Sequence, residues 1–480
     1  MVDTELCYMP ATEVMKRFKE RTLSPVEYVN ALISRHEDVE PGINATTHTF
    51  HDRALDQARE AETRFMRAGS RIRRLEGLPV MIKDLHAIKG HITSQSCKIF
   101  ANHRDTHSLP TVDRLLRAGA ILFARSASSE LGIATVCHST QWGVTRNPWN
   151  LAMSPGGSSG GSGAALAAGM TPLADGSDYG GSIRVPASAC GVFGYKPPYG
   201  RNPQDTPGSF DSYCHYGPMT RAVSDGAAMQ NVMSGQHRDD LTSLPGRIVV
   251  PDKPGSIKGW KIALSIDLGY KHVDPEVERM TRRAAAVFRD IGCEVDEVEL
   301  DWTSSSVVPW EIQSKAGVAQ SLAPYLMQWR YEILADSVRD AEQGMAYSAR
   351  DLFATHSIRA EMWLKLSPVM KRYNVMICPT LGVPSVAADH SIFDSRMKIN
   401  GHPVDPYMGW CLTYPFNALS QLPVASVPSG FAANGVPTGM QIIGRPFDDI
   451  SVFRAALAFE AAQPWFGRDM PKPQFRDPKA

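Results

Sequence analysis

Two glycine-rich segments in the first half of the chain contain serines that could act as nucleophiles. Residues 154–163 read SPGGSSGGSG and residues 178–184 read DYGGSIR, which place Ser158 and Ser182 in loops. A serine hydroxyl needs a neighbouring base before it can attack a carbonyl. Upstream, residues 77–84 read GLPVMIKD, so that Lys83 ends an apolar run. A buried lysine held neutral can be that base, and backbone N–H groups beside glycines can stabilise an oxyanion.

Taken one at a time, these segments have ordinary structural explanations. Glycine-rich loops are commonly tight turns or phosphate cradles, and most lysines of this kind are surface residues. Residues 154–163 lack the lysine that ends a P-loop, and neither segment has the glycine spacing of a dinucleotide-binding loop. Histidines at positions 86, 91, 103 and 107 lie close together but form no coherent set of metal ligands. We therefore expect neither a metal nor a cofactor.

The composition is that of an ordinary globular protein, and it argues against several classes of function. The 480 residues are 43% hydrophobic and 21% charged, with 50 basic and 50 acidic side chains. This balance lacks the basic excess of a nucleic-acid-binding protein. No apolar stretch approaches the roughly 18 residues of a membrane span. Eight scattered cysteines form no C-x-x-C pair, and the first residues lack the features of a secretory signal, so we expect a cytoplasmic protein with reduced thiols.

Helix and strand patterns alternate along the chain. Helices are expected from Ser24 onward and near residues 52–68, 111–118, 163–168, 275–291 and 451–462. Strands are expected near residues 78–82, 120–124, 172–174, 261–266, 294–300, 374–378, 424–427 and 438–443. This alternation predicts a layered α/β protein. Residues 236–259, which are rich in Pro, Gly, Asp and Ser, are expected to connect two halves of one fold.

The three motifs, in this order, resemble the amidase signature family of serine hydrolases. The resemblance is densest over residues 77–201, about a quarter of the chain. Matching positions also include Gly77, Pro79, Asp84, residues 147–149 (NPW), Pro186, residues 190–191, Gly194, residues 196–197, residues 200–201, Pro437, Gly439, Gln441 and Gly444. These motifs are specific for a family and a fold, and they say little about the substrate.

The resemblance implies an α/β fold with a large mixed central β-sheet flanked by helices on both sides. It predicts a single domain over residues 1–480, with an N-terminal helical segment at 1–75 and the signature core at 77–201. A second half from about residue 260 is expected to complete the sheet and the substrate pocket. The resemblance also implies an enzyme that needs no cofactor.

The resemblance assigns catalytic roles to three residues. It implies that Ser182 is the nucleophile, Ser158 the proton bridge and Lys83 the base, with a cis peptide bond between Gly157 and Ser158. Free lysine has a pKa of about 10.4, so a base working near neutrality needs a shift of roughly 3 units, and burial beside an apolar strand can supply it. Ser159 is the rival for the bridging position. The family spacing favours Ser158, and we expect Ser159 to support the loop.

The residues around Ser182 are expected to complete the site. The resemblance implies that backbone N–H groups around Tyr179, Gly180 and Gly181 hold the oxyanion. Asp178 and Arg184 are expected to stabilise this loop rather than to react, because an arginine is too basic to titrate but can fix a carboxylate or carbonyl.

The implied reaction is hydrolysis of a carboxylic amide, with anilides, esters, hydrazides and carbamates as further candidates. Four aromatic residues are expected to border the pocket and to favour an apolar or aryl acyl group, namely Tyr179, Trp142, Phe210 and Trp310. The alternatives are a glutamine-hydrolysing subunit of a tRNA-dependent amidotransferase and a non-catalytic ligand-binding relative. Val185 replaces a glutamine typical of the amidotransferase subunit, which argues against glutamine as the substrate. The expected partner is a small amide, with a homodimer left open.

Overall fold

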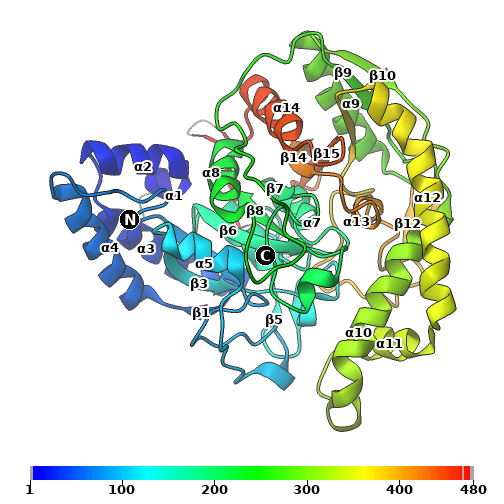
Figure 1. The fold of residues 1–480 in the computed structure, drawn as a ribbon, viewed down its shortest axis with the longest axis horizontal. Coiled ribbons are helices and arrows are strands. Elements are labelled where there is room, and N and C mark those ends of the chain that lie inside the picture. Colours follow the sequence, from blue (N-terminus) through cyan, green and yellow to red (C-terminus); the bar gives the residue numbers. More distant parts are fainter. Residues whose placement is uncertain (1–3, 468–469, 476–480) are drawn as a thin grey trace.

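The structure is a computed structural model that describes residues 4–467 and 470–475. Its centre is an 11-stranded sheet with the order β1-β3-β2-β6-β8-β7-β14-β15-β11-β9-β10 (Figure 1). These strands are β1 (Thr46–Thr49), β2 (Pro79–Lys83), β3 (Ile121–Ser126), β6 (Leu173–Asp178), β7 (Phe193–Lys196), β8 (His215–Thr220), β9 (Lys261–Leu264), β10 (Glu294–Glu297), β11 (Val375–Pro379), β14 (Val424–Phe431) and β15 (Pro437–Gly444). Two small ribbons join β4 (His138–Ser139) to β5 (Gly143–Val144) and β12 (Lys398–Ile399) to β13 (His402–Pro403).

The sheet is mixed, as expected. Strands β3, β2 and β6 run parallel to one another near one edge, and β11, β9 and β10 do so near the other. The strands between these two groups pair antiparallel. Strands β9, β10, β11, β14 and β15 come from the second half of the chain, which therefore extends the sheet begun by the first half.

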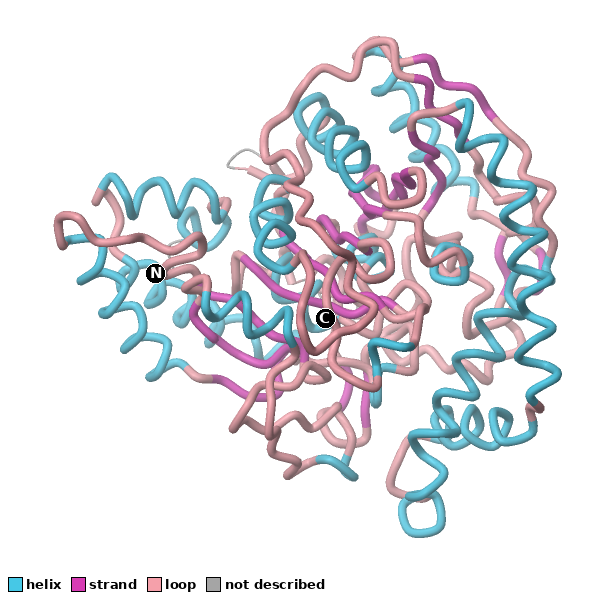
Figure 2. The backbone as a smooth tube through the Cα atoms, in the orientation of Figure 1, coloured by secondary structure: helices cyan, strands magenta, loops and turns pink. Residues whose placement is uncertain are grey.

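Helices surround this sheet (Figures 1 and 2). In the first half they are α1 (Thr4–Tyr8), α2 (Ala11–Glu20), α3 (Pro25–Ile43), α4 (His51–Met66), α5 (Pro110–Arg117), α6 (Gly160–Ala167), α7 (Arg184–Cys190) and α8 (Val223–Met233). In the second half they are α9 (Pro275–Asp290), α10 (Val308–Trp329), α11 (Ala335–Ala346), α12 (Ala349–Arg372), α13 (Pro415–Ala418) and α14 (Asp449–Ala462). Figure 1 shows the N-terminal helices at one end of the molecule and α10–α12 at the other.

Strand β11 shows that helices cover both faces of the sheet. Successive side chains of a strand point to opposite faces. Val375 and Ile377 pack in one apolar cluster with residues of α9 and α14, such as Phe288 and Phe459. Met376 and Cys378 belong to a second cluster that contains residues of α12 and α13. All four β11 side chains are fully buried, so this strand lies between two helical layers.

Most of the elements expected from the sequence are present, with shifted ends. Strand β6 continues to Asp178, beyond the expected end at residue 174. The segment 1–75 contains four helices, α1–α4, in its described part, but also the short edge strand β1. This strand reads TTHT and is only partly buried, so it lacks the apolar alternation that identifies a strand.

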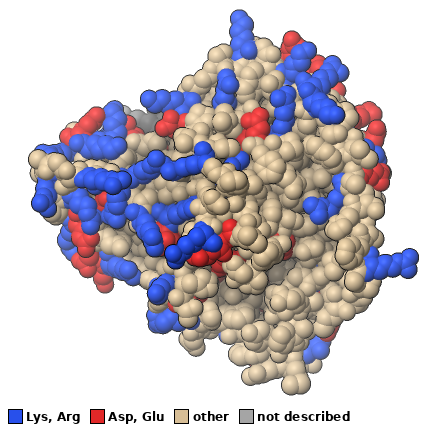
Figure 3. Space-filling model, viewed as in Figure 1, with Lys and Arg blue, Asp and Glu red and all other residues tan. Residues whose placement is uncertain are grey.

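The surface carries both signs of charge. In the view of Figure 3, basic and acidic side chains are interspersed over the N-terminal part, while much of the opposite lower part is uncharged. No helix in the described ranges is both long enough and apolar enough to cross a bilayer.

Candidate active site

Parallel strands β2 and β6 bring the base candidate to the glycine-rich loops. Val80 and Met81 of β2 pair with Leu173 and Ala174 of β6, so the carboxyl ends of the two strands lie side by side. Lys83 is the last residue of β2. The carboxyl ends of parallel strands are a common place for a ligand site in α/β proteins, because the loops that follow them converge there.

Lys83 is fully buried and its ammonium contacts two serines. Its Nζ donates to Ser158 Oγ at 2.7 Å and to Ser177 Oγ at 3.0 Å. Its backbone N–H donates to Asp175 Oδ1 at 2.8 Å, while the other carboxylate oxygen lies 2.6 Å from His86 Nδ1. Burial lowers the pKa of Lys83 to about 8, because the charged form has lost its water. Because of this lowered pKa, part of the Lys83 population is neutral near physiological pH.

The loops that contain Ser158 and Ser182 lie against each other. Both serines line one cavity, and the N–H of Ser159 donates to the Ser182 carbonyl at 3.2 Å. The peptide bond between Gly157 and Ser158 is cis, as the resemblance implied. Ser159 Oγ donates to the Ser177 carbonyl at 3.4 Å, and its side chain is fully buried. The structure thus brings Ser158 rather than Ser159 into contact with Lys83.

The loop before Ser182 is held by its carbonyl groups. Trp310 Nε1 donates to the Tyr179 carbonyl at 3.1 Å, and the Thr413 hydroxyl donates to the Gly180 carbonyl. In a trans peptide the N–H points opposite to the C=O, so these bonds turn the N–H groups of Gly180 and Gly181 away from Trp310 and Thr413. Neither N–H has a hydrogen-bond partner among the described residues. Both glycines and Ser182 line the cavity.

Gly181 cannot be replaced without disturbing this loop. Its φ of +132° is in a region that residues with a side chain rarely adopt. A Cβ atom at this position would lie 2.1 Å from Thr413 Oγ1. The glycine therefore allows both the backbone turn and the close approach of the threonine that holds the Gly180 carbonyl.

Asp178 and Arg184 form a buried ion pair behind the loop. Arg184 Nη2 lies 2.8 Å from Asp178 Oδ1, and both side chains are fully buried. Arg184 also donates to the Thr413 carbonyl at 2.9 Å and to Gln441 Oε1 at 2.7 Å. Burial disfavours the charged carboxylate, but the adjacent guanidinium overrides this and holds the pKa of Asp178 well below its usual range. Since Asp178 Oδ2 accepts the N–H of Ile183, the pair fixes the turn around Ser182.

The cavity that contains the two serines has a volume of about 520 Å³. Of the four aromatic residues expected at the pocket, Tyr179 and Trp310 line it, the latter from α10 in the second half of the chain. Trp142 lies elsewhere: its indole N–H donates to Ser94 Oγ at 3.1 Å and its ring packs on His48. The Phe210 side chain is 64% exposed and is likewise not part of the cavity wall.

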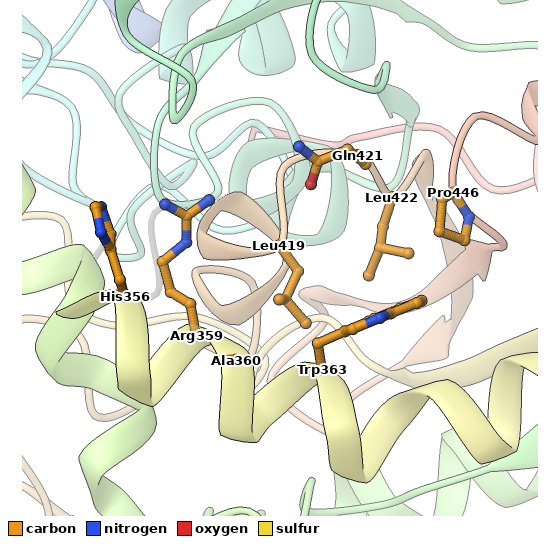
Figure 4. Close-up of a pocket in the computed structure, with 8 residues that line it drawn as sticks. All are labelled: His356, Arg359, Ala360, Trp363, Leu419, Gln421, Leu422 and Pro446. Carbon is orange, nitrogen blue, oxygen red and sulfur yellow. The ribbon is translucent and has the colours of Figure 1, made fainter.

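A second cavity of about 490 Å³ is separate from these serines. It lies between α12 and the segment that follows α13, and Trp363 and Leu422 are among its walls (Figure 4). None of the glycine-loop serines or Lys83 lines it. Arg359 from its wall lies over the Tyr213 ring at 5.3 Å and donates to the Ala418 carbonyl. We therefore assign the candidate active site to the cavity that holds Ser158 and Ser182.

Sequence reasoning missed two polar residues of the site, Ser177 and Asp211. Ser177 is the second contact of the Lys83 ammonium, and its place between Asp175 and Asp178 in an expected loop was the available signal. Asp211 lines the cavity from the segment before β8. Nothing in the local sequence distinguishes it from other loop aspartates, because its position depends on how residues 205–214 fold over Tyr179.

Comparisons with known proteins identify the family to which the chain belongs. The Amidase family profile matches residues 27–453. An acylamidase of Rhodococcus erythropolis is 35% identical over 97% of this chain and 98% of its own. A glutamyl-tRNA(Gln) amidotransferase subunit of Geotalea daltonii is 31% identical over 97% of this chain and 99% of its own. The crystal structure of a bacterial aryl acylamidase of the amidase signature family superimposes with a TM-score of 0.89 at 30% identity, covering 95% of this chain and 97% of that one.

The chain belongs to the amidase signature family. It is an amide-hydrolysing enzyme with the mixed α/β architecture of that family.

Proposed function

We propose that this enzyme hydrolyses carboxylic amides through an acyl-enzyme formed on Ser182, with Ser158 as the proton bridge and Lys83 as the base. The observation that carries the proposal is the 2.7 Å contact between Lys83 Nζ and Ser158 Oγ, at a cavity that Ser182 also lines. A lysine, a bridging serine and a nucleophilic serine form the same kind of relay that histidine provides in other serine hydrolases.

Acylation follows from this arrangement. The neutral amine of Lys83 takes the proton of the Ser158 hydroxyl while Ser158 takes the proton of Ser182. The Ser182 oxygen then attacks the amide carbonyl, and the N–H groups of Gly180 and Gly181 stabilise the oxyanion. Each such donor is worth about 3–4 kcal/mol in the transition state. Ser158 next protonates the nitrogen of the leaving amine and takes back the proton held by Lys83, and the C–N bond breaks.

Deacylation reverses these proton transfers with water in place of the amine. Water enters where the amine has left, gives a proton to Ser158 and attacks the acyl carbonyl of the ester on Ser182. Collapse of the second oxyanion breaks the ester bond, and the proton returns to the Ser182 oxygen. Every proton moves along Lys83, Ser158 and Ser182, so the proposed relay needs no metal-bound water.

The walls of the cavity favour an amide with an apolar or aryl portion. Apolar side chains from several elements face it, namely Leu85, Phe100, Leu131, Ile133, Val318, Leu322 and Met408. Aromatic rings are also present, among them Tyr179 and Trp310. A cavity of this size and lining is typical of sites for small organic ligands. The acylamidase and aryl acylamidase relatives support acyl amides, including anilides, as the substrate class.

Free glutamine, the substrate expected of an amidotransferase subunit, carries a carboxylate that is best stabilised by a cation once it is buried. No lysine or arginine stands among the described residues that line the cavity. The sequence argument from Val185 does not bear on glutamine binding in this cavity, because Val185 is fully buried in α7 and is not part of the wall. We therefore propose hydrolysis of acyl amides over glutamine hydrolysis.

A substrate panel with paired serine variants tests the proposal. Wild-type enzyme should hydrolyse an acyl 4-nitroanilide and an aliphatic amide with much larger kcat/KM than glutamine. Ser158→Ala should lower kcat by at least about 100-fold, the usual contribution of a proton-transfer group. Ser159→Ala is the matched control and should lower kcat less, since Ser159 does not contact Lys83. Equal losses in the two variants would contradict the assignment of the bridge.

The panel also addresses the two alternatives. A preference for glutamine would support the amidotransferase alternative. A non-catalytic ligand-binding relative would hydrolyse none of the amides and would fail to react with a fluorophosphonate, although it would still bind them.

A further inference from the structure

Asp211 places a carboxylate in the catalytic cavity that the proposed mechanism does not use. Asp211 lines the cavity and is only partly buried. Oδ2 accepts the Tyr179 hydroxyl at 2.8 Å, and Oδ1 accepts the N–H of Tyr213 at 3.0 Å. An ionised carboxylate offers about four acceptor positions. Two of them are filled here, which leaves the cavity-facing side of the group able to bind a further donor.

The charge of Asp211 has no counter-ion in the part of the chain that the structure describes. The cavity wall there contains no lysine or arginine, and no cationic group lies within ion-pair distance of this carboxylate. His86 also belongs to the wall, where its Nδ1 lies 2.6 Å from Asp175 Oδ2 and it forms no ion pair with Asp211. Burial raises the pKa of the Asp211 carboxyl, because little water reaches it. A cation that entered the cavity would relieve this cost by pairing with the ionised form.

We infer that Asp211 is the recognition site for a protonated amine, so that the preferred substrates are amides that also carry an ammonium group and, unlike glutamine, no free carboxylate. This inference rests on the proposed function and names the substrate class of the same cavity. An ammonium group beside Asp211 gains a charge-assisted hydrogen bond, which is stronger than a neutral one. A substrate with a free carboxylate in the same place would be repelled.

The surroundings of Asp211 suit a cation more than a second anion. The rings of Tyr179 and Tyr216 belong to the cavity wall, and the faces of aromatic rings attract cations. The Tyr213 ring stacks on Tyr179 but is not part of the wall, and Arg359 already lies over it. Apolar side chains such as Phe100 and Leu322 line other parts of the cavity and can contact the hydrocarbon portion of the substrate.

The position of Asp211 relative to the reacting groups also supports a role in specificity. Tyr179 joins the two regions, because its hydroxyl donates to Asp211 while its carbonyl belongs to the loop before Ser182. The carboxylate is therefore about one tyrosine side chain away from the oxyanion loop. At that separation a substrate can place its amide at Ser182 and a second group at Asp211.

A purely structural role for Asp211 predicts a different result from amine recognition. If the carboxylate served only to hold Tyr179 and the Tyr213 N–H, its loss would affect every substrate alike. Asp211→Asn keeps an acceptor and the side-chain size but removes the charge. The informative readout is therefore the ratio of kcat/KM for an ammonium substrate to kcat/KM for its uncharged isostere.

Two pairs of substrates provide this ratio. One pair compares ω-aminoacyl 4-nitroanilides with acyl 4-nitroanilides in which a methyl group replaces the ammonium. The other compares mono-N-acetyl diamines with N-acetyl alkylamines of equal length. Wild-type enzyme should prefer the ammonium member of at least one pair by roughly 10- to 100-fold, as expected for a hydrogen bond to a charged group. The pair that shows the preference tells whether the amine belongs to the acyl or the leaving portion.

Variants complete the test. Asp211→Asn should reduce the preference to near unity, whereas the control Asp205→Asn should leave it unchanged, because Asp205 pairs with exposed His107 outside the cavity. Equal kcat/KM within both pairs in the wild type, or equal losses for both members in Asp211→Asn, would overturn the inference. Calorimetric binding of the same pairs to Ser182→Ala separates this result from the mechanism. Tighter binding of the ammonium members would stand even if the proposed chemistry failed.

Discussion

Lys83 and Ser158 are separated by 75 positions in the sequence, yet their side chains meet at 2.7 Å in a fully buried contact. The lysine has a second serine partner, Ser177, at 3.0 Å. No carboxylate is within ion-pair distance of its ammonium anywhere in the described ranges. A cation in this setting is held by hydroxyl groups alone, so it can lose its proton more readily than a lysine in an ion pair.

This environment predicts how activity depends on pH. Burial lowers the pKa of Lys83 to about 8, and the neutral amine is the proposed base. The neutral fraction grows as pH rises, so kcat/KM for an uncharged anilide should increase through about pH 8 and level off above it. Initial rates from about pH 6 to about pH 10 measure this profile. A decrease over the same interval would contradict the role of Lys83 as the base.

Replacing Lys83 by methionine tests the base directly. Lys83→Met keeps most of the side-chain volume in the buried site but removes the nitrogen. We expect kcat to fall by at least about 100-fold near neutrality, with a residual rate that increases as hydroxide takes over the role of the base. A circular dichroism spectrum and the unfolding midpoint should show that the variant is folded. Near-normal activity at neutral pH would mean that another group deprotonates Ser158.

The residues proposed to be catalytic could be predicted from the sequence because three motifs occur together in one order, although each motif alone has an ordinary structural explanation. Lys83 ends an apolar run, and Ser182 follows two glycines. The strands and many of the helices also follow from periodicity, since burial on a sheet imposes it. The contacts of Ser177 and Asp211 depend instead on how separate segments meet.

The substrate pocket shows why such contacts escape sequence reasoning. Four aromatic residues were expected to line the substrate pocket, and of these four only Tyr179 and Trp310 line the cavity. Trp142 is held by Ser94, and Phe210 projects into solvent. An aromatic side chain satisfies burial in any apolar place, so its type does not tell which surface it meets. Helices α10–α12 were not predicted from the sequence. Helix α10 places Trp310 against the loop that precedes Ser182 and so makes it part of the cavity wall.

Trp310 should affect catalysis through the oxyanion loop. Trp310→Phe removes the indole N–H that donates to the Tyr179 carbonyl and leaves space beside Gly180. The Gly180 N–H then loses its fixed direction, so we expect kcat to fall by about tenfold, less than the loss of an oxyanion donor itself. Trp363→Phe at the other cavity is the matched control and should retain kcat (Figure 4). A change confined to KM would place Trp310 in binding alone.

The buried ion pair behind the loop should control stability. Arg184→Met leaves the Asp178 carboxylate without its cation and also removes the donors to Gln441 and the Thr413 carbonyl. We expect the free energy of unfolding to fall by about 3–5 kcal/mol, as for other broken buried pairs. Denaturant unfolding measures this loss. Arg396→Met, which breaks the exposed pair with Asp394, is the control and should match the wild type. An equally small effect in Arg184→Met would contradict the structural importance of the pair.

The most direct test of the account is to identify the residue that becomes covalently modified. The full-length enzyme is treated with a fluorophosphonate, and the modified peptide is located by mass spectrometry in the wild type, Ser182→Ala and Ser158→Ala. We expect one adduct, on Ser182, in the wild type. The same adduct should form at a much lower rate in Ser158→Ala, where the proton bridge is missing. No adduct should form in Ser182→Ala. Undiminished labelling of Ser182→Ala, or a wild-type adduct on a different serine, would contradict the assignment of the nucleophile.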